Sequence, residues 1–212
     1  PAFMSGRIAD IAIHPKDENI WYVAVGSGGV WKTENAGITW DPIFDKEKSY
    51  SIGCVTIDPN NPHTIWVGTG ENVGGRHVGY GDGIYRSNDG GKSWENMGLK
   101  ESQHISRILV HPENSNIIWV AAQGPLWNKG GERGLYKSID GGATWDQQNY
   151  LDPQINVDYF LAISGDTYEI ASRGDVVAFT MGDSWTDFVM MKSEDAGATW
   201  TKTTIWTNTY PL

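Results

Sequence analysis

The chain has 212 residues, with 26 acidic against 16 basic side chains and a formal net charge of −10. Such a surface repels phosphate backbones, so no nucleic-acid partner is expected. A single cysteine, Cys54, allows no intrachain disulfide and no cysteine-rich metal site, and no apolar run is long enough for a membrane span. We expect no cofactor. Eleven tryptophans and 26 glycines instead indicate many short strands joined by tight turns.

Along the chain, a strand, a proline turn and a second strand recur three times. The units are IAIHPKDENIWYVA (11–24), VTIDPNNPHTIWVG (55–68) and ILVHPENSNIIWVA (108–121). The proline stops the first strand because it has no N–H to donate to the ladder. The tryptophan in the second strand of each unit is expected at an equivalent core position; these residues are Trp21, Trp66 and Trp119.

A third strand follows each unit and ends in a polar string that closes on tryptophan. The strings are KTENAGITW (32–40), RSNDGGKSW (86–94), KSIDGGATW (137–145) and KSEDAGATW (192–200), a spacing typical of four-stranded propeller blades. Glycine permits positive φ in the turn, Asp or Asn accepts backbone N–H groups, and tryptophan covers the turn. We assign a structural role to Asn35, Trp40, Asp89, Trp94, Asp140, Trp145, Asp195 and Trp200.

These repeats predict an all-β chain: a β-propeller, complete or partial, of four-stranded antiparallel blades. One domain, 1–212, is expected, with blades at about 5–45, 50–98, 103–148 and 166–206 and an irregular connection at 146–166. Because strand direction alternates, the turns between the first and second strands lie on the same face of the propeller as the polar strings. We call this the box face. The loops between the second and third strands and the loops between blades lie on the opposite face, which we call the loop face.

The polar strings resemble the Asp-box, S-x-D-x-G-x-T-W, of BNR-repeat propellers, although the first has Thr33 and Asn35 in place of Ser and Asp. The stretch GRIADIAIHP…YVAVGSGGVWKTENAGITWDPIFD resembles sortilin/VPS10-like propellers and xyloglucanase-type glycoside hydrolases, and the resemblance covers 1–145. It implies a secreted, periplasmic or cell-surface protein. Such families generally have more than four blades. A partial propeller or fragment is therefore expected, whose open blade edges could self-associate or dock a partner chain.

Function is expected on the loop face, because its loops vary in length on a rigid scaffold. The loop of the second blade (68–83) is long, glycine-rich and polar. It is either a binding site or a loop that pins itself through its own Arg–carboxylate pair. Two tryptophans in other loops either stack on sugar rings or pack on a neighbouring blade. The candidate ligand-binding residues are Glu71, Asn72, Arg76, His77, Tyr80, Asp82, Trp127 and Trp185.

A glycosidase needs two carboxylates about 5–5.5 Å apart for retention or 6.5–9.5 Å for inversion. The catalytic candidates are Glu71, Asp82 and Asp183, with Glu132, Asp187 and Asp10 as further carboxylates. No spacing among them proves a pair. Xyloglucanase-type relatives carry an acidic residue where this chain has Ser27, and no FRIP-like stretch introduces a sialidase arginine triad.

Three functions therefore stay open. The leading hypothesis is an extracytoplasmic module that binds a glycan or an extended polypeptide. The alternatives are a glycoside hydrolase of the xyloglucanase or sialidase type, and a structural protein whose open blades dock partner chains. The histidines show no metal-binding pattern; His14 and His111 both sit beside prolines in turns.

Overall fold

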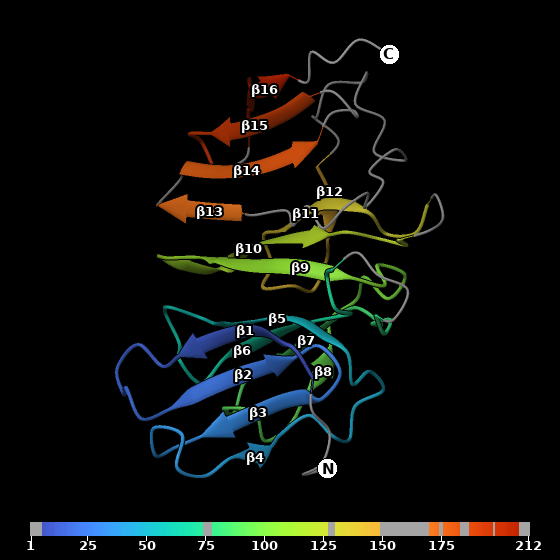
Figure 1. Ribbon diagram of the computed structural model, residues 1–212. Helices are drawn as coiled ribbons and strands as arrows, with labels where there is room; N and C mark the ends of the chain where they lie inside the picture. The colour runs from blue at the N-terminus through green and yellow to red at the C-terminus, as the bar shows by residue number, and fades with distance from the viewer. Residues whose placement is uncertain are drawn as a thin grey trace.

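The computed structural model describes residues 6–73, 78–126, 130–148, 170–173, 176–182, 187–196 and 198–207. This part of the chain forms sixteen strands in four separate antiparallel sheets of four strands each, with no helix (Figure 1). In every sheet the strands lie side by side in chain order, so each sheet is a simple meander. The all-β prediction and the four-stranded repeat are confirmed. No helix within the described ranges could cross a membrane.

We number the sheets blades 1 to 4. Blade 1 contains β1 (Ile8–Ile13), β2 (Trp21–Val25), β3 (Gly29–Thr33) and β4 (Asp41–Pro42). Blade 2 contains β5 (Ile52–Ile57), β6 (Ile65–Thr69), β7 (Ile84–Ser87) and β8 (Glu95–Asn96). Blade 3 contains β9 (Ile105–His111), β10 (Asn114–Ala122), β11 (Gly134–Ser138) and β12 (Asp146–Gln147). Blade 4 contains β13 (Ile170–Arg173), β14 (Val176–Gly182), β15 (Asp187–Ser193) and β16 (Thr201–Thr207). Residues 149–169, most of the predicted irregular connection, lie outside the described residues.

The apolar core lies between blades, because the first strands pack in series: β1 on β5, β5 on β9 and β9 on β13. We call the side of a blade toward the preceding blade its rear face and the other side its forward face. At the first junction, the forward face of blade 1 meets the rear face of blade 2 through Tyr22, Ala24, Val30 and Phe44 against Ile52, Val55, Ile65, Val67 and Tyr85. At the second, Cys54, Trp66, Ile84 and Leu99 meet Ile105, Ile108, Val110, Ile118, Val120 and Tyr136.

An aromatic ring under a cation marks the forward face of each of the first three blades. Tyr22 lies under Lys32 with 5.6 Å between the ammonium nitrogen and the ring centroid. The guanidinium of Arg86 lies 5.6 Å from the ring of Trp66, and blade 3 repeats the arrangement with Lys137 at 5.8 Å from Trp119. Each pair is directly opposed across the second and third strands of its blade. The cation lies over the ring and adds a favourable cation–π interaction.

The predicted equivalence of Trp21 with Trp66 and Trp119 is therefore wrong, since Tyr22 occupies that position. The physical reason is strand periodicity: a shift of one residue moves a side chain to the opposite face of the sheet. Trp21 instead lies partly buried on the rear face of blade 1. There its ring meets the ring of Trp40 edge to face, with centroids 6.3 Å apart.

Each polar string closes the hairpin between the third and fourth strands of its blade. In blade 2, Asp89 Oδ1 accepts hydrogen bonds from Ser87 Oγ at 2.7 Å and from the Ser93 N–H at 3.0 Å, while Oδ2 accepts from Ser93 Oγ at 2.6 Å. The same set of bonds lowers the pKa of Asp140 and of Asp195 to about 2, with the hydroxyl donor four residues on as the largest cause. In blade 1 the amide of Asn35 makes comparable bonds, so the Asn variant closes the same turn.

The closing tryptophans also connect neighbouring blades. Trp94 Nε1 donates to the Ile43 carbonyl of blade 1 at 2.7 Å, and Trp145 Nε1 donates to the Met97 carbonyl of blade 2 at 2.7 Å. The cations of the forward faces reinforce these contacts, because Arg86 donates to the Gly141 carbonyl in the next blade's turn at 2.9 Å. The polar strings of blades 2 and 3 thus fix both their own hairpins and the position of each blade on the preceding one.

Candidate functional site

Three blades converge on one loop-face residue, Glu71. The positions that immediately precede the first strands of blades 1, 2 and 3 are Arg7, Ser51 and His104. Arg7 Nε donates to Glu71 Oε1 at 2.6 Å, and Ser51 Oγ accepts from the Glu71 N–H at 3.0 Å. His104 Nδ1 lies 2.8 Å from the Glu71 carbonyl. One residue therefore uses its side chain, its N–H and its C=O to tie three blades together.

The two partners of the Arg7–Glu71 ion pair differ in their exposure to solvent. The Glu71 side chain is 5% exposed, whereas that of Arg7 is 49% exposed. The carboxylate lies against Gly26, where an added Cβ would fall 2.3 Å from Oε1, so a larger residue there would displace the Glu71 side chain. Among the described residues, the Glu71 carboxylate is paired with Arg7, an arginine of blade 1. The alternative prediction, that the second-blade loop is held by an Arg–carboxylate pair of its own, concerns Arg76, which lies outside the described residues.

His104, which is hydrogen-bonded to the Glu71 carbonyl, is fully buried, and this burial lowers its pKa to about 4. The hydrogen bond to the Glu71 carbonyl opposes that shift, and the positive charge of Arg133 reinforces it. A carbonyl can only accept, so we assign the proton of the neutral ring to Nδ1. Nε2 is then a buried acceptor, and it has no hydrogen-bond partner in the described part of the chain.

Acid is expected to destabilise the fold through His104. In the unfolded chain the imidazole gains a proton near its ordinary pKa of 6.5, but the folded protein resists protonation until about pH 4. The contribution of His104 to the free energy of unfolding should therefore be constant above pH 6.5 and decrease as the pH falls from 6.5 to 4. Urea unfolding at several pH values measures this slope, and His104→Gln should flatten it. An NMR titration that shows the His104 ring protonating near pH 6.5 would contradict the assignment.

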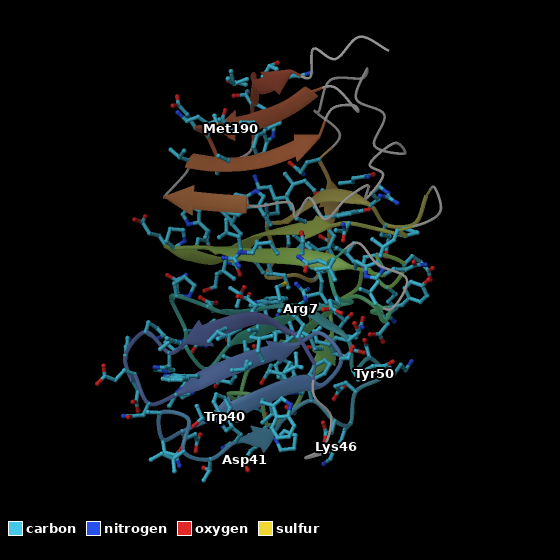
Figure 2. The ribbon with its side chains drawn as sticks, in the orientation of Figure 1. Arg7, Trp40, Asp41, Lys46, Tyr50 and Met190 are labelled. Carbon is cyan, nitrogen blue, oxygen red and sulfur yellow. The ribbon has the colours of Figure 1, made fainter. Side chains whose placement is uncertain are left out.

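Two exposed tyrosines stand on this face. Tyr80 is 60% exposed and its ring meets the ring of His104 edge to face, with centroids 5.5 Å apart. Tyr50, in the loop between blades 1 and 2, is 59% exposed. Its hydroxyl lies near Gly79, which belongs to the same loop as Tyr80. Figure 2 shows Tyr50 on the right, the side on which the second-to-third-strand loops lie in Figure 1, and Trp40 of the box face toward the left. Sequence reasoning missed Tyr50, although it lies in a blade-to-blade loop assigned to this face.

Asp82 belongs to a different set of contacts from Glu71. Its Oδ2 accepts from the Tyr85 hydroxyl at 2.7 Å, and its Oδ1 is buried without a hydrogen-bond partner among the described residues. Burial, reinforced by Asp82, raises the pKa of Tyr85 to about 12. Burial and then the charge of Asp82 also raise the pKa of Glu47, a residue that the sequence did not single out. Among the described residues, no hydrogen bond or ion pair joins Glu71 to Asp82.

The other candidate residues are placed as follows. Asn72 is buried next to Glu71, and Glu132 Oε2 accepts from the Glu101 N–H at 2.8 Å. Asp187 is the first residue of β15. No group of three or more metal-ligating side chains occurs in the ranges that the structure describes. The candidates that lie outside those ranges are Arg76, His77, Trp127, Asp183 and Trp185.

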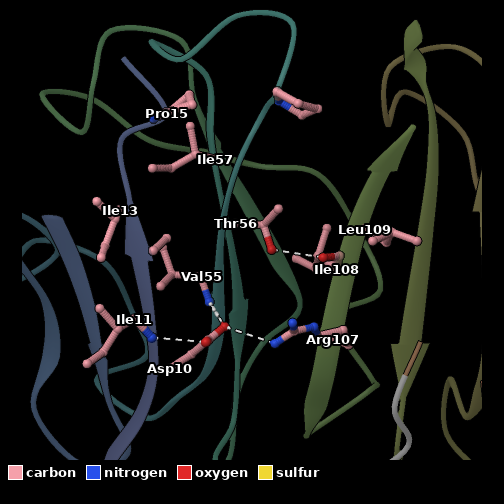
Figure 3. Close-up of a pocket in the computed structure, with 12 residues that line it drawn as sticks. Asp10, Ile11, Ile13, Pro15, Val55, Thr56, Ile57, Arg107, Ile108 and Leu109 are labelled. Atoms are coloured by element: carbon pink, nitrogen blue, oxygen red, sulfur yellow. Dashed lines mark hydrogen bonds and ion pairs between the residues drawn. The ribbon is translucent and has the colours of Figure 1, made fainter. Parts of the chain in front are cut away.

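Asp10 lines a pocket of about 290 Å³ between the first strands of blades 1, 2 and 3 (Figure 3). Its Oδ2 accepts from the Val55 N–H at 3.2 Å and lies 3.6 Å from an Arg107 guanidinium nitrogen. The walls are mostly aliphatic, and two prolines of the box-face turns, Pro15 and Pro59, contribute to them. Asp10 is thus engaged with the neighbouring strands, which makes it a link between blades.

No protein-family model matches the chain. In sequence it is similar to a xyloglucanase from Paenibacillus sp, with 23% identity over 218 residues, which cover 92% of this chain and 20% of that protein. A xyloglucanase from Hypocrea jecorina is 28% identical over 156 residues, covering 67% and 18%. Xyloglucanase Xgh74A from Acetivibrio thermocellus is 26% identical over 228 residues, covering 92% and 25%. The chain thus spans a quarter or less of these relatives.

Solved structures show the same fold. The GH74 enzyme from Niastella koreensis matches 92% of this chain and 29% of its own length, with a TM-score of 0.66 and 20% identity. YCF48 from Cyanidioschyzon merolae matches 98% of this chain and 59% of its own length, with a TM-score of 0.58 and 17% identity. The chain therefore has the blade architecture of these β-propellers, and its sequence is similar to that of xyloglucanases.

Proposed function

We propose that this chain forms part of a xyloglucanase-type glycoside hydrolase and that its loop face contributes to binding the glycan. The similarity to several xyloglucanases supports the substrate class. The observation that carries the proposal is the exposed Tyr80 ring, which packs edge to face on His104, the residue that is hydrogen-bonded to the Glu71 carbonyl. Pre-organised aromatic rings beside polar groups are typical of sugar-binding surfaces, since a ring packs on the apolar face of a pyranose.

The contacts favour binding over bond cleavage for the described residues. Glu71 is nearly buried and ion-paired, and both oxygens of Asp82 are either hydrogen-bonded or enclosed. Neither carboxylate is presented freely to a glycosidic bond. Tyr50, Tyr80 and Arg7 are exposed to solvent, Arg7 over about half of its side chain. We therefore assign sugar stacking to the tyrosines and hydroxyl recognition to Arg7.

Titration of the protein with a xyloglucan oligosaccharide by calorimetry tests this proposal. Tyr80→Ala should weaken binding about two- to tenfold, as expected for loss of one aromatic contact. Tyr80→Phe keeps the ring and should bind like the parent. Ile139→Ala, at a 65% exposed position on the box face, should have no effect. Absence of binding by the folded parent, or equal affinities for parent and Tyr80→Ala, would contradict the proposal.

A separate assay addresses cleavage. Release of new reducing ends from xyloglucan would be measured for the parent and for Glu71→Gln and Asp82→Asn. If the parent releases reducing ends, we expect both variants to do so at a rate within severalfold of the parent's when the substrate is saturating. Loss of release at saturating substrate in either variant would show that the residue acts in the chemical step, and the assignment of binding alone would be wrong.

A further inference from the structure

The loop-face end of blade 3 holds three buried polar side chains. We call Ser102, His104 and Gln123 the polar cluster, and each of them is at most 1% exposed. Ser102 Oγ, His104 Nε2 and both amide atoms of Gln123 have no hydrogen-bond partner within the ranges that the structure describes. Buried polar atoms in native proteins are almost always hydrogen-bonded, to protein groups or to bound molecules, because an unsatisfied one is unfavourable. Several such atoms in one region therefore indicate a binding site for a polar group.

Backbone hydrogen bonds hold the members of the polar cluster next to one another. The His104 N–H donates to the Ser102 carbonyl at 2.6 Å, and the Gln123 N–H donates to the His104 carbonyl at 2.8 Å. Ser102 and His104 belong to the loop between blades 2 and 3, whereas Gln123 begins the loop that follows β10. Gln103, between Ser102 and His104, has φ of +58°, which is uncommon for a residue with a side chain. The meeting of the two loops thus includes an unfavourable backbone conformation.

The polar cluster adjoins the exposed loop of blade 2. The ring of Tyr80, which is 60% exposed, meets the ring of the fully buried His104 edge to face, with centroids 5.5 Å apart. The next residue, Gly81, donates its N–H to the Gln103 carbonyl at 2.7 Å, which holds this loop against the backbone of the cluster. The Tyr80 ring therefore forms part of the cover between His104 and solvent.

The chemistry of the polar cluster favours a neutral ligand that both donates and accepts hydrogen bonds. His104 Nε2 is an acceptor, because Nδ1–H is donated to the Glu71 carbonyl and burial keeps the ring neutral above about pH 4. The Gln123 amide offers two N–H donors and one acceptor, and the Ser102 hydroxyl can do either. The charges of Arg133 and Glu71 shift the pKa of His104 in opposite directions, so they favour neither a cation nor an anion there. A hydroxyl group satisfies all of these requirements.

We propose that Ser102, His104 and Gln123 form a binding site for a neutral hydroxyl group, supplied either by an internal water molecule or by a hydroxyl of a bound glycan. The bound group donates its proton to His104 Nε2 and accepts from the Gln123 amide. It thereby fixes the ring form whose Nδ1–H supports the Glu71 carbonyl. The water source goes beyond the proposed function, whereas the glycan source rests on it.

The sign of a stability change tests whether the Gln123 amide is hydrogen-bonded to a bound group. Gln123→Met keeps the shape of the side chain and removes its polar atoms, so urea unfolding should show the folded-to-unfolded ratio reduced roughly tenfold. Gln148→Met is the matched control, since Gln148 is 5% exposed and its amide donates to the Asp146 carbonyl at 3.0 Å. We expect similar losses for the two variants. A stabilised Gln123→Met beside a destabilised Gln148→Met would show that the Gln123 amide binds nothing, and would overturn the proposal.

Crystal structures of the parent, free and with a xyloglucan oligosaccharide, identify the source of the hydroxyl. We expect an oxygen about 2.7–3.2 Å from both His104 Nε2 and the Gln123 amide. A water there in both structures assigns the site to internal water, and a sugar oxygen in the second assigns it to the glycan. If the oligosaccharide does not bind, the proposed function fails, but the free structure still decides whether water occupies the site. Polar-cluster atoms that bond only one another or other parts of the chain, or that bond nothing in either structure, would overturn the proposal.

Discussion

Replacing Trp66 with alanine is expected to lower the free energy of unfolding by about 3–5 kcal/mol. The Trp66 side chain is 1% exposed and belongs to the core between blades 2 and 3. Its removal leaves a cavity, uncovers Gly142 and takes away the ring under Arg86. Urea unfolding followed by tryptophan fluorescence and circular dichroism measures the loss.

Trp21→Ala is the matched control, because the two tryptophans occur in near-identical sequence contexts. Trp21 lies partly buried on the uncovered rear face of blade 1, and its substitution should cost about 1 kcal/mol. Tyr22→Ala, at the true counterpart of Trp66, should cost about 3 kcal/mol or more. Equal losses for Trp21→Ala and Trp66→Ala, with little loss for Tyr22→Ala, would contradict the assigned register.

Gly70→Ala is expected to destabilise the protein by about 2–4 kcal/mol, through a backbone clash together with an unfavourable φ. Gly70 has φ of +85°, and an added Cβ would fall 1.8 Å from the Gln103 carbonyl oxygen of the neighbouring loop. Gly70 also immediately precedes Glu71, so the clash should displace the residue on which three blades converge. Urea unfolding gives the stability change, and calorimetry should show weaker glycan binding.

Gly130→Ala separates the two causes. Gly130 has nearly the same φ, +84°, but an added Cβ would meet nothing within 4 Å. This variant should lose only about 1 kcal/mol from the strained φ. If both glycine variants lost the same stability, the close approach of the two loops at Gly70 would not contribute, and the packing of blade 2 against blade 3 on this face would need revision.

The blades could be predicted from sequence because the information is local. A box such as 137–145 contains its own donors, acceptor and turn residues, and the hydrogen bonds of Asp140 all lie within that string. The error at Trp21 has the same origin. The three units were aligned on their tryptophans, which placed Trp21 with Trp66 and Trp119. The distance from the turn proline is the better guide: it is seven residues from Pro15 to Tyr22, from Pro59 to Trp66 and from Pro112 to Trp119.

The site was harder to predict because its contacts are not local. The sequence indicated Glu71 and Tyr80 through the length and polarity of their loop. It could not indicate that Arg7 and His104, 64 and 33 residues away, bind Glu71. Arg7, Ser51 and His104 do occupy one repeat position, but their side chains are chemically different. Their shared target therefore becomes visible only when the blades are packed together.

Hydrogen–deuterium exchange with and without a saturating xyloglucan oligosaccharide tests the central claim, that the loop face contributes to glycan binding and the boxes are scaffold. We expect slower exchange of backbone amides around Tyr50, Glu71 and Tyr80, with no change in the boxes at 35–39, 89–93 and 140–144. Protection confined to the boxes, or no protection at concentrations that saturate a xyloglucanase, would contradict it.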